Sequence, residues 1–185
     1  MQFFYLILLI FICNNAPGQT RVQNWEKGLN KVLYEFLQCK KPIDDNSPCN
    51  IFVCNAIYTV YGVNDLYDEK TQRCRTANEI YDYLNTNNKQ WIKMGMADNQ
   101  KTLSEAQDYA NQGYVVVAVY SNKPHGHIAI VLPGVLKSSS KWNLNVPNSA
   151  SFFMNLPDNS YINLPLSYAF NNEMYKTTAI YRRLF

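Results

Sequence analysis

The chain has 185 residues, of which 47% are hydrophobic, and a formal net charge of +3. This length is typical of a single domain, and the apolar fraction excludes intrinsic disorder as the main state. The small charge, without any run of Lys and Arg longer than two residues, argues against nucleic-acid binding. With only 7 Gly and no glycine-rich phosphate motif, the sequence gives nucleotide chemistry no support.

The N-terminus carries an apolar run over residues 3–13. This run is too short to span a membrane and has the length of a signal-peptide hydrophobic region. Ala16 and Gly18 would occupy the small-residue positions before a cleavage site. We therefore expect a signal peptide over residues 1–18, a single domain over residues 19–185, a secreted or periplasmic location and no stable membrane insertion after cleavage. A lipid anchor on Cys13 is less well supported because Ile12 is bulky, and a buried N-terminal strand is the remaining alternative.

Removal of residues 1–18 would leave four cysteines, namely Cys39, Cys49, Cys54 and Cys74. Disulfides persist outside the reducing cytosol, so two disulfides are one interpretation. The other is one nucleophilic thiol with at most one pair among the other three. The sequence does not fix the pairing, since both Cys39 with Cys74 and Cys54 with Cys74 are permitted.

The first half of the mature chain is expected to be helical. Apolar residues recur every three or four positions over residues 22–38, which predicts an amphipathic helix. A turn-rich segment follows, and a second helix is expected to begin with Ser47 as N-cap and Pro48 in its first turn, and to end at Gly62. Two candidate capping boxes, Thr76 with Glu79 and Thr102 with Glu105, predict two further helices, the last ending near Gly113.

The second half changes to strand patterns. Residues 114–120 and 127–132 are runs rich in β-branched residues, joined by a turn that contains Pro124, so they predict a β-hairpin. Residues 141–147 and 177–184 predict further strands, and residues 138–140 a turn. Helices followed by an antiparallel sheet define an α+β domain, with N-terminal helices packed on a small sheet.

One cysteine and one histidine stand out as candidates for chemistry. Cys49 falls in the first turn of a predicted helix, where the helix dipole favours the thiolate. The only histidines after residue 18 are His125 and His127. His127 opens a predicted strand, which would orient its ring as a base, whereas His125 lies in the connecting turn; both could equally be ordinary surface residues.

The segment Cys49-Asn50-Ile51-Phe52-Val53 resembles the start of the nucleophile helix in NlpC-type and CHAP cell-wall hydrolases, which are papain-like cysteine peptidases and amidases. The segment over residues 126–131, GHIAIV, resembles their histidine motif, and Gly113 to Val117 resembles the strand before it. The resemblance covers residues 45–150. Two positions depart from the family pattern, Asn50 for the usual Ser or Thr and Tyr114 for the usual Asp.

The resemblance implies a papain-like fold and a third polar residue that orients the histidine. Asn148 is the preferred candidate and Asn145 the alternative. The backbone N–H of Cys49 would contribute to the oxyanion hole, and tyrosines and tryptophans could line a groove for the substrate. The implied function is hydrolysis of amide bonds in peptidoglycan, by an N-acetylmuramoyl-L-alanine amidase or a stem-peptide endopeptidase with Cys49, His127 and Asn148 as the triad.

Two alternative functions remain open. In one, the protein is an inactive secreted binding module whose Cys49 is held in a disulfide; in the other, the same fold acts on protein or lipid amides. No metal motif such as C-x-x-C or H-E-x-x-H occurs, and no cofactor is expected. Peptidoglycan is the expected partner, an inhibitor protein is a possible second partner, and no nucleic acid is expected.

Overall fold

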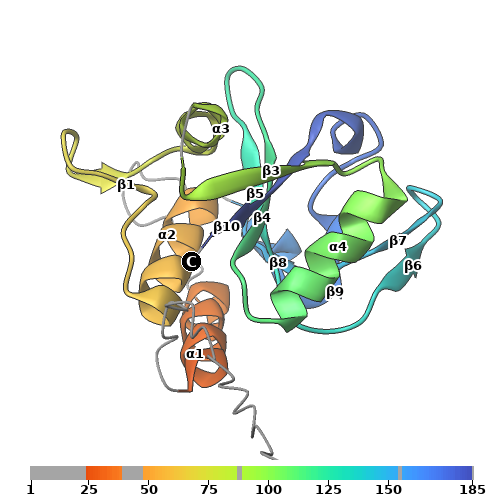
Figure 1. Ribbon diagram of the computed structural model, residues 1–185, viewed down its shortest axis with the longest axis horizontal. Helices are drawn as coiled ribbons and strands as arrows, with labels where there is room; N and C mark the ends of the chain where they lie inside the picture. The colour runs from red at the N-terminus through yellow and green to blue at the C-terminus, as the bar shows by residue number, and fades with distance from the viewer. Residues whose placement is uncertain (1–23, 39–47, 87–88, 154–155, 185) are drawn as a thin grey trace, which may run out of the picture.

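A computed structural model describes residues 24–38, 48–86, 89–153 and 156–184. They form a mixed α+β domain with antiparallel sheets, which confirms the predicted class (Figure 1). The predicted signal segment, residues 1–18, lies outside the described residues. The helices are α1 (Trp25–Gln38), α2 (Pro48–Tyr61), α3 (Ala77–Asn85) and α4 (Gln100–Asn111), with short 3-10 turns η1 (Pro157–Asn159), η2 (Leu166–Tyr168) and η3 (Tyr175–Thr177). Within the described part of the chain, no helix is long and apolar enough to cross a membrane.

The central sheet has six strands in the order β3-β10-β4-β5-β8-β9, and every neighbouring pair is antiparallel. These strands are β3 (Trp91–Met96), β4 (Val116–Tyr120), β5 (His127–Val131), β8 (Asn148–Ser151), β9 (Tyr161–Pro165) and β10 (Ala179–Arg183). Two small ladders, β1 (Tyr67–Asp68) with β2 (Arg73–Cys74) and β6 (Lys137–Ser139) with β7 (Leu144–Val146), complete the fold. The predicted hairpin is present as β4 and β5, with Tyr120 opposite His127.

Successive strand residues point to opposite faces of the sheet, and both faces are buried against helices or loops. Ile128 and Ile130 of β5 face a core built with α1, α2 and α3, which we call the α2 face. Ala129 and Val131 face a second core built with α4 and the segment around Phe170, which we call the α4 face. In Figure 1, α1 and α2 accordingly lie to one side of the central strands and α4 to the other.

Most of the predicted helix ends are confirmed. α2 begins at Pro48 and closes at Gly62, whose N–H donates to the Tyr58 carbonyl in a left-handed conformation (φ 65°). Thr76 and Glu79 form the predicted capping box of α3. The box predicted at Thr102 and Glu105 is wrong, because α4 begins three residues earlier with Asn99, whose side-chain oxygen accepts from the N–H groups of Lys101 and Thr102.

Three segments differ from their predictions. The first half is not purely helical, since β3 lies between α3 and α4 and pairs with β10 at the edge of the sheet. Residues 137–139 form β6 rather than a turn, paired with β7. Only residues 144–146 of the strand predicted over 141–147 are extended, whereas the strand predicted over 177–184 is confirmed as β10.

A buried ion pair joins the end of the chain to the loop after α2. The Arg183 guanidinium donates to the Asp65 carboxylate, which also accepts from the Trp91 indole at 3.1 Å. Both charged side chains are less than one-tenth exposed. The pair therefore ties β10 and β3 to the segment that follows α2.

Candidate active site

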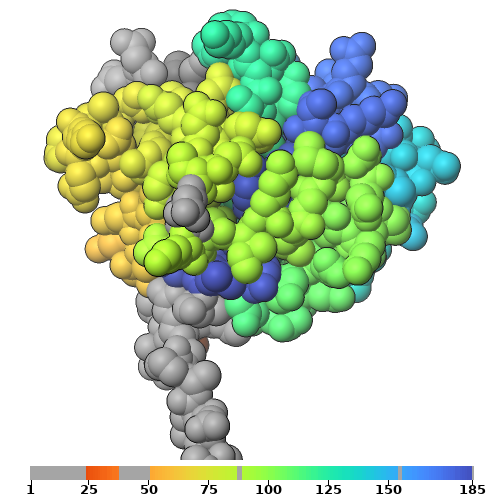
Figure 2. Space-filling view, turned by 45° about the horizontal axis from the view of Figure 1, so that its top comes forward, coloured from red at the N-terminus to blue at the C-terminus, as the bar shows by residue number. Residues whose placement is uncertain are grey.

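The β4–β5 hairpin carries His127 and is fixed by α3. Asn78, in the first turn of α3, donates to the Asn122 carbonyl and accepts from the Asn122 N–H and the Ser121 hydroxyl. Gly126 passes so close to this contact that a Cβ there would lie 2.5 Å from the Asn78 side-chain oxygen, so only glycine fits. Figure 2 shows the hairpin tip, coloured turquoise, beside the blue segment around residues 168–178.

The His127 ring is enclosed by two aromatic rings and one hydroxyl. Its Nε2 lies 2.7 Å from the Ser151 Oγ on the neighbouring strand. Phe153 stacks on the ring with centroids 4.5 Å apart and 16° between the planes, and Phe170 meets it edge-on at 5.5 Å. Only 8% of His127 is exposed. These contacts fix the position of the ring, whereas His125 is exposed in the turn.

Burial also keeps the imidazole neutral. Removal from water disfavours the charged form and lowers the pKa of His127 from 6.5 to about 4. In the tautomer whose Nε2–H donates to Ser151, the Nδ1 nitrogen carries the lone pair. One ring nitrogen is thus fixed and the other can accept a proton, but a pKa of about 4 makes the buried imidazole a weaker base at neutral pH than a solvent-exposed histidine.

The predicted orienting residue, Asn148, does not reach His127, and that assignment is wrong. The Asn148 carbonyl accepts from the N–H of Leu132, which directly follows β5 and is five residues from His127, or about 17 Å at the rise of an extended strand. Its side-chain amide donates to the Pro133 carbonyl and the Asn163 side-chain oxygen. Spacing along the chain could not reveal this, because the strand register decides which residue lies beside the ring.

The alternative, Asn145, is held elsewhere as well. Its N–H and carbonyl bind the side-chain amide of Gln100, which attaches β7 to the start of α4. The polar partner that the sequence reasoning missed is Ser151. Ser149 and Ser151 are two residues apart, so both point to the α4 face of β8. This two-residue spacing of polar side chains is the sequence signal that could have identified Ser151.

Cys49 has the predicted backbone position, in the first turn of α2, while its side chain lies outside the described part of the chain. Along the sheet, the start of α2 is level with His127, because Phe52 packs on Phe152 with centroids 4.5 Å apart. The opposite end of α2 contacts the start of the hairpin, where the Tyr61 hydroxyl donates to the Gly113 carbonyl.

Across the sheet, however, α2 and the His127 ring are separated. Phe152 belongs to the core of the α2 face, whereas Phe153 and Phe170, which contact the ring, belong to that of the α4 face. The described contacts therefore place the two predicted catalytic elements at the same end of the sheet but on opposite faces.

The structure resolves one of the open cysteine pairings. Cys54 of α2 is bonded to Cys74 of β2, across a sequence separation of 20 residues. This disulfide removes Cys54 as a nucleophile and excludes a Cys39–Cys74 bond in the same molecule. Cys39 lies outside the described residues.

Within the described ranges, no group of three or more His, Cys, Asp or Glu side chains could hold a metal ion. Comparison with protein-family models found no match to this chain, and comparison with curated proteins found none either.

Proposed function

We propose that the protein is a secreted cysteine hydrolase of the papain-like type that cleaves amide bonds of peptidoglycan. Cys49 is the nucleophile, His127 is the base, and Ser151 takes the orienting role first predicted for Asn148. The observation that supports this proposal best is the position of the His127 ring at the start of a central strand, with its Nε2 hydrogen-bonded to Ser151.

In the proposed reaction, the His127 Nδ1 takes the proton of the Cys49 thiol, and the sulfur attacks the amide carbonyl carbon. The tetrahedral intermediate collapses to a thioester when the imidazolium returns the proton to the leaving amine. Water, deprotonated by the same imidazole, then hydrolyses the thioester and frees the thiol. The helix N-terminus favours the thiolate and the oxyanion.

The proposal has to meet one condition, because α2 and the His127 ring lie on opposite faces of the sheet. His127 is the first residue of β5, so the ring lies at the end of the sheet rather than over its middle. The start of α2 is level with that end. The reaction therefore requires the thiol and the Nδ1 nitrogen to meet around the end of the sheet, which involves rotation of the ring away from Phe153 or movement of the first turn of α2.

The test is digestion of purified peptidoglycan followed by mass analysis of the fragments, which also identifies the cleaved bond. We expect wild-type protein to release fragments, and Cys49→Ala and His127→Ala to release none while remaining folded by circular dichroism. His125→Ala is the matched control and should be fully active, because that exposed histidine is two residues from the base. Full activity of Cys49→Ala would contradict the proposal, and activity on protein amides alone would redirect it to another substrate.

The disulfide supports one alternative function. Once Cys54 and Cys74 are paired, Cys39 and Cys49 are the two cysteines left after residue 18. A bond between them would make the protein an inactive binding module. Counting thiols in the unreduced, denatured mature protein separates the two: two free thiols favour the enzyme, and none favours the binding module.

A further inference from the structure

A groove of about 190 Å³ lies at the opposite end of β5 from His127, between the start of α1 and the residues that follow β5. It is lined by Trp25, Glu26, Leu29, Asn30, Leu132, Pro133 and Asn163. Leu132 is five residues from His127 along the strand, about 17 Å away, so this groove is separate from the candidate active site.

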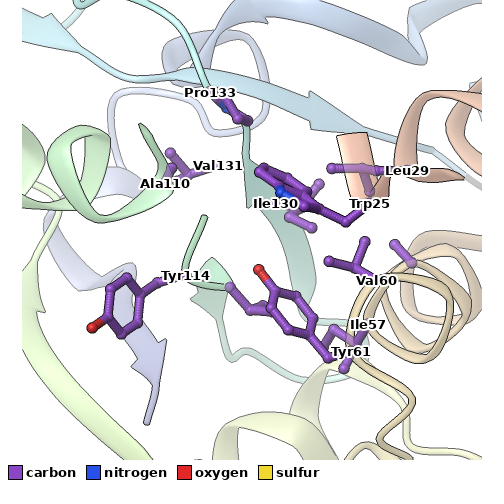
Figure 3. Close-up of a pocket in the computed structure, with 12 residues that line it drawn as sticks. Trp25, Leu29, Ile57, Val60, Tyr61, Ala110, Tyr114, Ile130, Val131 and Pro133 are labelled. Atoms are coloured by element: carbon purple, nitrogen blue, oxygen red, sulfur yellow. The ribbon is translucent and has the colours of Figure 1, made fainter. Parts of the chain in front are cut away.

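The inner wall of the groove is closed. Trp25 also lines the pocket shown in Figure 3, where its indole lies between Leu29 and Ile130. That inner pocket holds only about 10 Å³, about the space of one water molecule. A ligand in the outer groove would therefore rest against the half-buried indole and would not pass into the core.

Asn163, on the polar rim of the groove, is held in place by two neighbouring side chains. The Asn163 side-chain oxygen accepts from Asn148, and its carbonyl accepts from Lys137 at 2.9 Å. These bonds hold the Asn163 backbone and its side-chain oxygen, and an amide also has two N–H donors that a ligand could use. On the opposite side, Glu26 and Asn30 are exposed on the first turns of α1.

The lining chemistry defines a class of ligand. Among the described residues, one indole, three apolar side chains, two neutral amides and one carboxylate line the groove, and no cationic side chain does. A carboxylate without a cation disfavours anions, whereas amides and a carboxylate suit hydroxyl groups, and an indole face packs on apolar C–H surface. The volume is below the roughly 300–1,000 Å³ of drug-sized pockets, which suits a single ring.

We infer that this groove binds an uncharged pyranose ring of a saccharide, stacked on Trp25 and hydrogen-bonded by Asn30, Glu26 and Asn163. The ring would come from a glycan strand or from a free oligosaccharide. This inference does not rest on the proposed hydrolase activity, because the binding module would use the same groove.

The test is a titration of the folded protein with tri-N-acetylchitotriose and, separately, with maltotriose, observed by amide NMR shifts and tryptophan fluorescence. We expect saturable binding of at least one, with shifts centred on residues 25–30 and 132–134. Trp25→Ala should weaken it about tenfold or more, and Asn30→Ala several-fold. Asn30→Ala covers the case in which Trp25→Ala does not fold, since alanine suits an exposed helix position.

Tyr34→Ala is the matched control, because Tyr34 is an exposed aromatic residue of the same helix outside the groove. Its affinity should equal that of the wild type. Cys49→Ala should also bind normally, which separates failure of this inference from failure of the hydrolase proposal. Absence of saturable binding to both sugars, or unchanged affinity in Trp25→Ala and Asn30→Ala, would overturn the inference.

Discussion

The His127 imidazole and the Ser151 hydroxyl are hydrogen-bonded at 2.7 Å across neighbouring strands. Ser151 has no exposed surface, so in the folded protein solvent does not reach the hydroxyl and the bond is made between the two side chains alone. The position of the candidate base therefore depends on a residue that lies 24 positions further along the chain and in none of the recognised motifs.

Replacing Ser151 by Ala should leave the His127 Nε2 buried without a partner. We expect a loss of about 1–3 kcal/mol in unfolding free energy and, if the hydrolase proposal holds, a fall in kcat with little change in KM. Urea unfolding and peptidoglycan digestion measure the two effects. Ser151→Thr, which keeps the hydroxyl, should recover much of both, and equal values for Ser151→Ala and wild type would contradict an orienting role.

The stability of the fold should depend on pH through His127. Its pKa is about 4 in the folded protein against 6.5 as the reference value, so between these values the unfolded chain binds the proton and the folded chain does not. Stability is therefore complete above pH 6.5 and decreases as the pH falls toward 4, by up to about 3 kcal/mol. Urea unfolding between pH 7.5 and 4 should show this decrease, and His127→Gln should flatten it. The prediction would be refuted if the unfolding free energy fell equally with pH in wild type and His127→Gln, or if NMR gave a pKa near 6.5 for His127 in the folded protein.

The ion pair between Asp65 and Arg183 should be sensitive to removal of one partner. Asp65→Ala leaves the buried Arg183 charge without its carboxylate, and we expect a loss of about 3–5 kcal/mol. Thermal unfolding monitored by circular dichroism measures it. Asp68→Ala is the control, because Asp68 and Arg75 are 3.9 Å apart in a more exposed pair whose loss should cost far less. Similar melting temperatures for the two variants would show that the buried Asp65–Arg183 pair does not stabilise the fold more than the more exposed pair does.

Reduction should destabilise the protein through the Cys54–Cys74 bond. Opening a loop of this size removes about 3 kcal/mol in the chain-entropy description. A reductant should lower the melting temperature of wild-type protein toward that of the Cys54→Ala/Cys74→Ala double variant. The double variant should change little on reduction; a similar fall there would point to a second stabilising disulfide instead.

The sequence predicted those elements whose local signals agree with their packing. The β4–β5 hairpin consists of β-branched runs, and α3 carries its own cap, so both were found with their correct type. β3 and β8 were missed because WIKMGM and NSAS lack a clear alternating apolar pattern, and β3 is specified by its distant partner β10.

The candidate site was predictable in part for the same reason. His127 as the first residue of a strand, and Cys49 in the first turn of a helix, follow from local sequence. Which side of the sheet the ring faces, and which β8 residue it meets, depend on strand register. That register is set by the long-range pairing of β5 with β8. The sequence therefore predicted Asn148 as the residue that orients His127, whereas the residue beside the ring is Ser151.

The position of β10 has a consequence for how the sheet assembles. β3 and β4 do not pair with each other; each pairs with β10, formed by residues 179–183. Nearly ninety residues separate β3 from this partner, so its contacts must wait for closure of a long loop, which slows folding. During synthesis, β3 would remain an unpaired edge until residues 179–183 are available, and any truncation before them would split the sheet rather than shorten it.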